Sequence, residues 1–511
     1  MIITFLSASL CIFLVVVLVR FLQTVWWTPI RIQHIMASQG IKGPTYKFLH
    51  GNTKEIVRMR GKSISTPLDN TSHPIFARIM PDIHAWRKLY GKNYLNWQGP
   101  QAQLVVTDPE SVKEIMNNKD GAYHKGRPDR FLKKLLGDGI VVTEGEKWTK
   151  LRKIANHAFY AESLKGMVPA MIASVETMLE RWRQCEGKEI EVNQESRLLS
   201  SEVISRTAFG SSYLEGEKIF AMLTEMGTIS SRNRFKIRLH GIGKFLKSRD
   251  DLESDKLQQA IRELIIAMIN KREEKMMRGE ENNYGSDFLG SLIKASHDPD
   301  EKNRISVDEM VDECNTFYLA GQETTNAFLA WCLLLLAIHT DWQEKARKEV
   351  FELFGQQNPN AEGIARLKIM SMILNETLRL YPPVTSMFKR LEGEVRLGKM
   401  IIPANAHVVI PVLALQHDPE IWGQDVDLFK PERFADGVAK ATNNNIAGYF
   451  PFGFGPRICV GSNFALNQGK IALSMILQRY RLTVSPSYVH SPILILSIFP
   501  ENGIPVVFNK L

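Results

Sequence analysis

The first residues form one long apolar run, which differs from everything that follows. Residues 2–19 are eighteen residues without a charge, and the run ends at Arg20. That length suits a helix that crosses a membrane. A cleaved signal peptide is the alternative, but the run has neither a basic segment before it nor a clear small-x-small cleavage site. The pattern therefore predicts a single transmembrane anchor, with Trp26 and Trp27 at the interface and Arg20 and Arg31 on the cytosolic side.

Helical periodicity dominates the rest of the chain. The helices that it predicts cover residues 167–183, 248–279, 306–340 and 367–381. The third is nearly free of proline and glycine and, at about 1.5 Å per residue, would span roughly 50 Å. Short alternating segments predict strands at 99–107, 400–402, 408–411 and within 493–507. The patterns together predict a mainly α fold with small β-sheets.

Composition predicts one large folded unit behind the anchor. The chain has 511 residues, 44% of them hydrophobic, and shows no internal repeat, low-complexity tract or long linker. Glycines and a proline at residues 40, 43, 44 and 51 indicate a hinge. We therefore expect an anchor at 1–27, a linker at 28–52 and a catalytic domain at 53–511.

The number and spacing of the cysteines and the net charge limit the classes of function that the chain can have. The five cysteines are scattered and odd in number, which argues against a disulfide framework and a zinc site and favours a reducing compartment. The formal net charge of +9 would suit nucleic acid, but no binding motif or basic run interleaved with aromatic residues supports that partner. We therefore predict no nucleic-acid binding.

A glycine-rich loop near the C-terminus surrounds one cysteine. Residues 452–461 read F-x-x-G-x-R-x-C-x-G, with Cys459 just before an apolar helix. A lone thiolate there is a good soft ligand for one metal. Gly455 and Gly461 would let backbone amides approach the sulfur. For Cys459 alone, a buried structural cysteine in a tight turn is the better interpretation, but all five positions of the pattern are filled.

The predicted long helix contains a polar interruption at 320–325, Ala-Gly-Gln-Glu-Thr-Thr. A glycine, an acid and two threonines contradict helix propensity, and such conflicts often mark functional sites. The Thr324 hydroxyl can donate and accept hydrogen bonds, and it can bond back to a carbonyl and open a groove. A plain cap or kink of the helix is the alternative.

Two further spacings place side chains on one helical face. Glu376 and Arg379 are three residues apart and can form an ion pair, with Arg433 following in a Pro-Glu-Arg-Phe segment. An isolated pair of this kind is usually a weak surface contact. Trp148 and Arg152 are four residues apart, and both side chains can donate to a carboxylate.

These four motifs, in this order over residues 148–461, resemble the haem-thiolate cytochromes P-450, and the resemblance covers the chain from about residue 40 onward. It implies the P-450 fold and a haem b, iron protoporphyrin IX, with the Cys459 thiolate as axial ligand. Such a ligand favours O–O cleavage. It also implies a buried structural network of Glu376, Arg379 and Arg433. The haem-binding residues that it implies are Trp148, Arg152, Gly321, Phe452, Arg457, Gly461 and either Arg390 or its neighbour Lys389.

The resemblance implies a monooxygenase that inserts one oxygen atom from O2 into a C–H bond of a lipophilic small molecule. Electrons would come from NADPH through a flavoprotein, the NADPH–cytochrome reductase, and Glu323 and Thr324 would guide protons. The protein would be a single-pass protein of the endoplasmic reticulum membrane, with its catalytic domain in the cytosol. Flanking signatures, such as Tyr-Pro-Pro at 381–383, resemble the plant clan of steroid- and terpenoid-oxidising members. Lys147, Lys150 and Lys153 form either a reductase-docking face or a solvated one.

Substrate identity and two rival functions remain open at this stage. The apolar pocket would use Phe317, Leu319, Val384, Met387, Phe388 and Phe499, with Thr316, Tyr318 and Thr385 to orient a hydroxyl; each can equally be a core residue. One rival is an NADPH-independent hydroperoxide isomerase or dehydratase, but such members commonly lose the glycine and threonine that this chain keeps at Gly321 and Thr324. The other is a non-enzymatic haem sensor, for which the acid–alcohol pair is superfluous.

Overall fold

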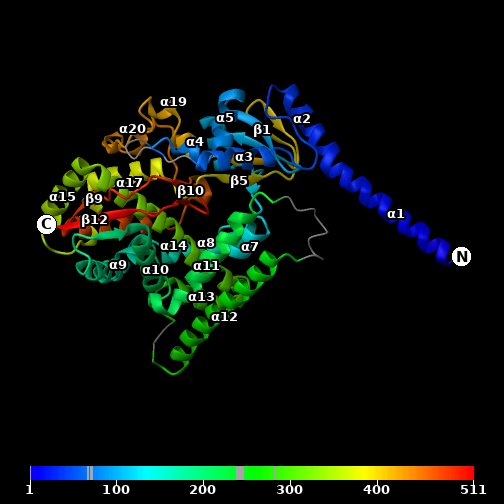
Figure 1. Cartoon of the computed structure of the whole chain (residues 1–511). Coiled ribbons are helices and arrows are strands. Elements are labelled where there is room, and N and C mark those ends of the chain that lie inside the picture. The colour runs from blue at the N-terminus through cyan, green and yellow to red at the C-terminus, as the bar shows by residue number, and fades with distance from the viewer. Residues whose placement is uncertain (1, 66–67, 69–72, 237–246, 281–283) are drawn as a thin grey trace.

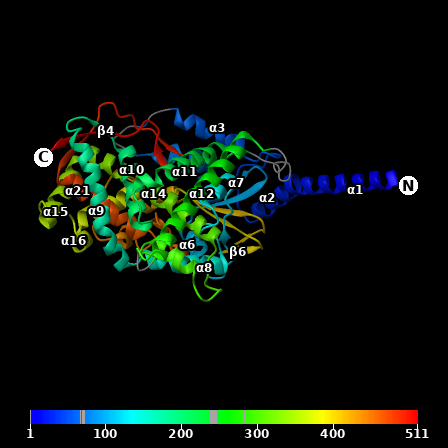
Figure 2. The same ribbon diagram turned by 90° about the horizontal axis from the view of Figure 1, so that it is seen from below.

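Helices surround several small sheets, and one long helix projects from this body (Figures 1 and 2). The computed structural model describes residues 2–65, 68, 73–236, 247–280 and 284–511. Its α-helices are α1 Ile2–Leu22, α2 Thr28–Ser38, α3 Thr53–Ile64, α4 Ile75–Ile79, α5 Pro81–Tyr90, α6 Pro109–Asn117, α7 Arg130–Leu136, α8 Gly145–Ala158, α9 Ala161–Arg183, α10 Val192–Ala208, α11 Tyr213–Asn233, α12 Arg249–Met277, α13 Phe288–Ser296, α14 Val307–Ile338, α15 Thr340–Phe354, α16 Ala361–Arg366, α17 Lys368–Leu380, α18 Val412–Gln416, α19 Pro419–Trp422, α20 Val438–Ala441 and α21 Ser462–Leu477. A π-helical segment, η1, covers Gln23–Trp27, and short 3-10 helices cover Pro431–Phe434 (η3), Ile446–Gly448 (η4) and Gly455–Arg457 (η5). The mainly α fold is confirmed, and the four predicted helices correspond to α9, α12, α14 and α17.

The strands form four small sheets. The largest has the order β1-β2-β8-β5-β3, and β2 and β8 are its parallel pair. The strands are β1 Asn93–Gln98, β2 Gln101–Val106, β3 His124–Lys125, β4 Glu189–Glu191, β5 Met387–Arg390, β6 Val395–Leu397, β7 Met400–Ile402, β8 His407–Ile410, β9 Tyr480–Val484, β10 Pro492–Leu494, β11 Ile498–Pro500 and β12 Pro505–Lys510. The predicted strands are confirmed as β2, β7 and β8 and as β10 to β12 near the C-terminus.

The N-terminal helix can anchor the protein in a membrane. From Phe5 to Ser38 the chain is helical, and it contains a stretch that is long and apolar enough to span a bilayer. From Phe5 onward the side chains of α1 are exposed almost throughout, whereas Val25 in η1 is buried. In both views α1 projects away from the body (Figures 1 and 2).

The segment predicted as a linker, residues 28–52, packs on the body at several points. Ile32 and Met36 of α2 are buried in a core cluster that includes strands of the largest sheet. A side chain at Gly43 would place its Cβ 1.8 Å from the Leu95 carbonyl oxygen, so only glycine fits there. The Tyr46 amide donates to the Gln33 side chain at 2.8 Å. These contacts restrict the hinge motion that glycine and proline in this segment suggested.

Helix α14 runs through the middle of the core. It begins with a capping box, in which Ser306 and Glu309 each accept from the other's backbone amide. Most of its 32 residues are buried, because an apolar helix is stable when it is covered by its neighbours. Its most extensive helical neighbour is α10. The contact is close because Gly321 faces Ile204, whose Cδ1 would lie 2.7 Å from a Cβ at that position.

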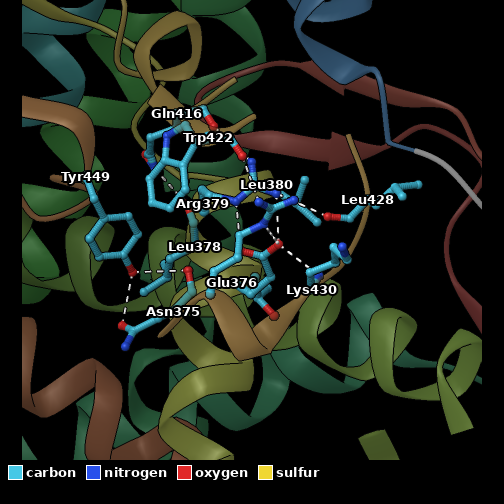
Figure 3. A network of polar contacts seen from close by, with 12 residues as sticks. Asn375, Glu376, Leu378, Arg379, Leu380, Gln416, Trp422, Leu428, Lys430 and Tyr449 are labelled. Atoms are coloured by element: carbon cyan, nitrogen blue, oxygen red, sulfur yellow. Dashed lines mark hydrogen bonds and ion pairs between the residues drawn. The ribbon is translucent and has the colours of Figure 1, made fainter. Parts of the chain in front are cut away.

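A buried ion network joins α17 to the segments that lead toward the C-terminus (Figure 3). Arg379 Nε donates to Glu376 Oε2 at 2.7 Å, and both side chains are 0% exposed. Glu376 Oε1 also accepts from Arg379 Nη2 at 2.8 Å and from the Lys430 amide at 2.9 Å. Arg433 Nε lies 3.5 Å from the same oxygen. The predicted network of these three residues is confirmed.

Replacing Glu376 by glutamine should lower the free energy of unfolding by about 3–5 kcal/mol, because the buried guanidinium of Arg379 loses its carboxylate. The matched control is Glu432→Gln in η3, which is exposed and should change stability by less than about 0.5 kcal/mol. Thermal and urea denaturation of the detergent-solubilised chain would measure both. Equal losses in the two variants would contradict a structural role of the network.

Candidate functional site

Cys459 lies in the loop between η5 and α21. Its amide donates to the Phe452 carbonyl at 2.9 Å, which closes the loop. The residue is exposed, yet desolvation by surrounding protein raises the pKa of its thiol, and the Gly461 amide and the charge of Arg152 oppose that rise. These two properties conflict for a residue on the outer surface. They agree for a thiol that protein groups surround closely and that a ligand can still reach.

The two glycines of this loop have different functions. Gly455 has a φ of +75°, and a Cβ there would lie 2.7 Å from the Met116 carbonyl oxygen. Its glycine is thus required by backbone conformation and by Met116, and the predicted approach of its amide to the sulfur stays a prediction. Gly461 is the glycine beside the thiol, since its Cβ would lie 3.9 Å from the Cys459 sulfur.

Helix α8 brings the predicted Trp148 and Arg152 against the cysteine loop. The Arg457 guanidinium lies over the Trp148 ring, 4.6 Å from its centroid, in a cation–π contact. Arg152 Nη1 donates to the Ile458 carbonyl at 2.6 Å. Arg457 Nη2 donates to the Thr143 carbonyl at 2.7 Å. Three of the predicted haem-binding side chains therefore come together with the loop that carries the thiol.

Two lysines add positive charge to this site. Lys125 and Lys389 are direct partners in the β3–β5 pair, a position where like charges destabilise a sheet. Burial lowers the pKa of Lys125 to about 8, with Arg457 and Lys389 acting in the same direction. Burial, followed by Arg457, also lowers the pKa of Lys389. Glu144 is the carboxylate that opposes both shifts. The site thus holds an excess of buried positive charge.

Lys389 and Arg390 differ in how they are already paired. Arg390 forms ion pairs with Glu392 and, at 3.7 Å, with Glu144, although its Nε has no partner. Within the described part of the chain, no carboxylate lies at ion-pair distance from the ammonium of Lys389 or Lys125. Sequence reasoning missed Lys125 because only the strand register brings it opposite Lys389.

The polar interruption of α14 faces open space. Ala320 is exposed although Leu319 and Gln322 beside it are buried. The Thr324 hydroxyl donates to the Ala320 carbonyl at 2.7 Å, which confirms the predicted bond back to the helix. A Cβ at Gly321 would meet Ile204 of α10, and the predicted contact of this glycine with a cofactor stays a prediction. Ala320 is therefore the small residue on the open face of the helix.

The predicted pocket residues divide into exposed and core side chains. Val384 and Phe388 are each 42% exposed and remain candidates. Phe317 packs on Phe288 with ring centroids 4.0 Å apart, and Tyr318 stacks on Phe209 at 3.9 Å; both belong to the core.

The polar side chains predicted to orient a hydroxyl are largely engaged within the protein. The Thr316 hydroxyl donates to the Leu136 carbonyl at 2.7 Å, and the Tyr318 hydroxyl donates to the Met268 sulfur at 3.5 Å. Thr385 is buried. Thr316 and Tyr318 thus have structural partners where the sequence suggested a substrate contact.

The residues of this site are suited to a metal that a cofactor already coordinates. In the described residues, no group of three or more His, Cys, Asp or Glu side chains could hold a bare ion. A single accessible thiol can complete the coordination of a metal already held by a macrocycle, as in a haem. The excess of cations around Arg457 and Lys389 suits the two carboxylates of such a group.

Comparisons with known proteins agree with this interpretation. The family model described as cytochrome P-450 matches residues 75–505. The chain is 58% identical to cytochrome P-450 CYP749A22 of Panax ginseng, over 99% of this chain and 97% of that protein. It is 38% identical to cytochrome P-450 734A1 of Arabidopsis thaliana, over 98% and 96%. It is 40% identical to the 11-oxo-beta-amyrin 30-oxidase of Glycyrrhiza uralensis, over 96% and 94%.

Cys459→Ser should abolish the thiolate-type absorption of the reduced, carbon-monoxide-treated haem, because a hydroxyl cannot replace the thiolate as axial ligand. Difference spectroscopy of membranes that contain the variant measures this. Cys185→Ser is the control, since Cys185 is a half-buried free cysteine on another part of the chain, and it should keep the spectrum. A Cys459 variant with an unchanged spectrum would mean that another residue is the ligand.

Proposed function

Since this chain belongs to the cytochrome P-450 family, we propose that it inserts one oxygen atom from O2 into a C–H bond of a steroid- or terpenoid-like lipophile. The observation that supports this substrate class most directly is the 40% identity, over 96% of the chain, to an oxidase of 11-oxo-beta-amyrin, a triterpenoid. Exposed apolar side chains at Val384 and Phe388 suit a ligand of this kind.

We propose that the cofactor is haem b, held by residues of the cysteine loop, α8 and the largest sheet. Cys459 would hold the haem iron through its thiolate, the Gly461 amide would steady the charge of that thiolate, and Phe452 would cover the same side of the haem. The haem-carboxylate partners are Trp148, Arg152, Arg457, Lys389 and Lys125, with Arg390 as the alternative to Lys389. When bound, the haem supplies the activation of oxygen and the oxidation of carbon.

The chain's own contribution is to place the substrate and to move protons. Glu323 and Thr324 follow each other on α14, next to the exposed Ala320. The half-buried Glu323 carboxyl can exchange protons with solvent. The Thr324 hydroxyl donates to Ala320 O and keeps its oxygen free to accept. Together they form an acid–alcohol pair that holds and passes protons on the open side of the helix.

We further propose that the electron donor is an NADPH-dependent flavoprotein reductase that docks beside α8. Lys147, Lys150 and Lys153 of α8 supply positive charge there. Lys147 Nζ lies 3.7 Å from Glu309 Oε1 and Lys150 Nζ donates to the Arg304 carbonyl, whereas Lys153 is exposed. Because part of this surface is already paired, a solvated face that binds no reductase is the alternative. Removal of Lys153 would distinguish a docking surface from a solvated one.

The anchor supports a location in the endoplasmic reticulum membrane. Arg20 and Arg31 follow the apolar run of α1, which favours a cytosolic catalytic domain under the positive-inside rule. The proposed division is an anchor at 1–27, a connecting segment at 28–52 that packs on the body, and a catalytic domain at 53–511.

Membranes that contain the chain and a reductase should convert a component of a plant triterpenoid extract into a product heavier by one oxygen atom, only when NADPH is present. Mass spectrometry of the extract measures this. In Thr324→Ala, product per NADPH should fall by about tenfold or more while peroxide rises, because proton transfer is impaired. An isomerised or dehydrated product formed without NADPH would instead support the hydroperoxide-isomerase function.

Lys389→Met should release haem to an acceptor protein at least about tenfold faster than the unchanged chain, because a charge-assisted contact to a buried carboxylate is lost. Arg390→Met on the same strand is the matched variant, and its effect should be smaller because Arg390 already pairs with Glu392 and Glu144. Transfer of haem to apomyoglobin gives both rates. The opposite order would assign the haem carboxylate to Arg390.

A further inference from the structure

A serine near the C-terminus contacts the acid of the proposed proton-transfer pair. Ser497 lies in the turn between β10 and β11, and its hydroxyl donates to Glu323 Oε1 at 2.7 Å. The serine is 3% exposed, whereas Glu323 is only half-buried. The two residues are 174 positions apart in the chain, so no local pattern in the sequence connects them.

The hairpin that carries Ser497 is held on two sides. On one side, Trp331 Nε1 of α14 donates to the Ile498 carbonyl at 2.9 Å. On the other, the buried Arg78 donates from Nε to the Pro492 carbonyl at 2.8 Å and from Nη2 to the Ser491 hydroxyl at 2.7 Å. Because these contacts are buried, they fix the hairpin against the same helix that carries Glu323.

A donor held in a fixed position orients the carboxylate of Glu323 and gives its two oxygens different roles. A glutamate side chain loses rotamer entropy when it is ordered, and a hydrogen bond to a charged oxygen is among the stronger ones. The serine hydroxyl has one proton, and it directs that proton to Oε1. Oε2 is then the oxygen left to gain and lose a proton.

We propose that Ser497 is a positioning residue, which holds the Glu323 carboxylate through Oε1 so that Oε2 exchanges protons on the open side of α14. This inference rests on the proposed function, because it assigns Ser497 a part in the same proton transfer. Ser497 acts through Glu323 and does not itself touch the reacting atoms.

Proton transfer can be followed without knowledge of the substrate. When it is slow, NADPH, H+ and O2 give NADP+ and H2O2, with one peroxide for each NADPH. When it is fast, two NADPH, two H+ and one O2 give two NADP+ and two water molecules, with no peroxide. The peroxide formed per NADPH in reconstituted membranes, without added substrate, therefore reports proton delivery.

The test compares Ser497→Ala, Ser497→Thr, Glu323→Gln and the double variant. Ser497→Ala should raise peroxide per NADPH by about twofold, and Ser497→Thr, which keeps the hydroxyl, should restore the original value. The double variant should match Glu323→Gln alone, because residues that act as a unit are not additive. The matched control is Ser485→Ala, since Ser485 is a buried serine whose hydroxyl donates to the Glu189 carboxylate and not to Glu323. It should leave the ratio unchanged.

Hydrogen exchange of the hairpin, read by mass spectrometry on the same protein, tests the contact independently of turnover. Residues 494–498 should exchange faster in Ser497→Ala but not in Glu323→Gln, whose amide oxygen still accepts from the serine. Unchanged exchange and an unchanged ratio in Ser497→Ala would overturn the inference, as would additive effects in the double variant. If the unchanged chain oxidised no NADPH, the proposed function would fail, whereas altered exchange would still show the contact.

Discussion

The charge of Glu376, a carboxylate without access to water, is the constraint on which the rest of the body depends. A buried charge is tolerated only where several donors surround it. Here they are Arg379 from the same helix and the Lys430 amide. Arg379 also donates to the carbonyls of Gln416 and Leu428. One ion pair thus ties α17 to α18 and to the segment before η3, which leads on to the cysteine loop.

Two other features are unfavourable for folding alone but favour the binding of a cofactor. The buried Lys389 and the half-buried Lys125 stand opposite each other in a sheet, and an alanine in the middle of a core helix remains exposed. Each feature costs stability in an empty chain, through like-charge repulsion in one case and through an unfilled interior in the other. Such conflicts between local and global preference concentrate where a protein performs its function. The bound haem proposed above would remove both costs at once.

Local patterns were enough to predict the elements and several contacts. The helix at 306–340, the bond of Thr324 back to its own helix, and the pair of Glu376 with Arg379 all depend on residues within one or two turns. The contacts that the sequence did not reveal are those whose partner lies elsewhere in the chain. Gly321 and Gly455 are required by Ile204 and Met116, and Phe317 points into the core, toward Phe288. No periodicity contains that information, because it depends on how α10, α6 and α13 pack in three dimensions.

Lys125 is a residue of the candidate site that the sequence alone could not reveal. Nothing in its neighbourhood marks it as a partner for an anion, and it becomes one only because β3 pairs with β5 in a particular register. Ser497 reaches Glu323 only through a hairpin that the chain forms near its end. The motif residues could thus be predicted from the sequence, whereas the side chains that support them could not.

The continuous helix from α1 through η1 to α2 has a mechanical consequence. Val25 and Met36 fix its second half to the body, so the 21 residues of α1 project as a stiff arm of about 30 Å and not as a loose tether. Each residue of an α-helix turns the chain by about 100°. Adding one residue within η1 would therefore swing the whole body around the arm by more than a quarter turn. The number of residues in this segment, and not only their hydrophobicity, sets which side of the protein meets the lipid headgroups.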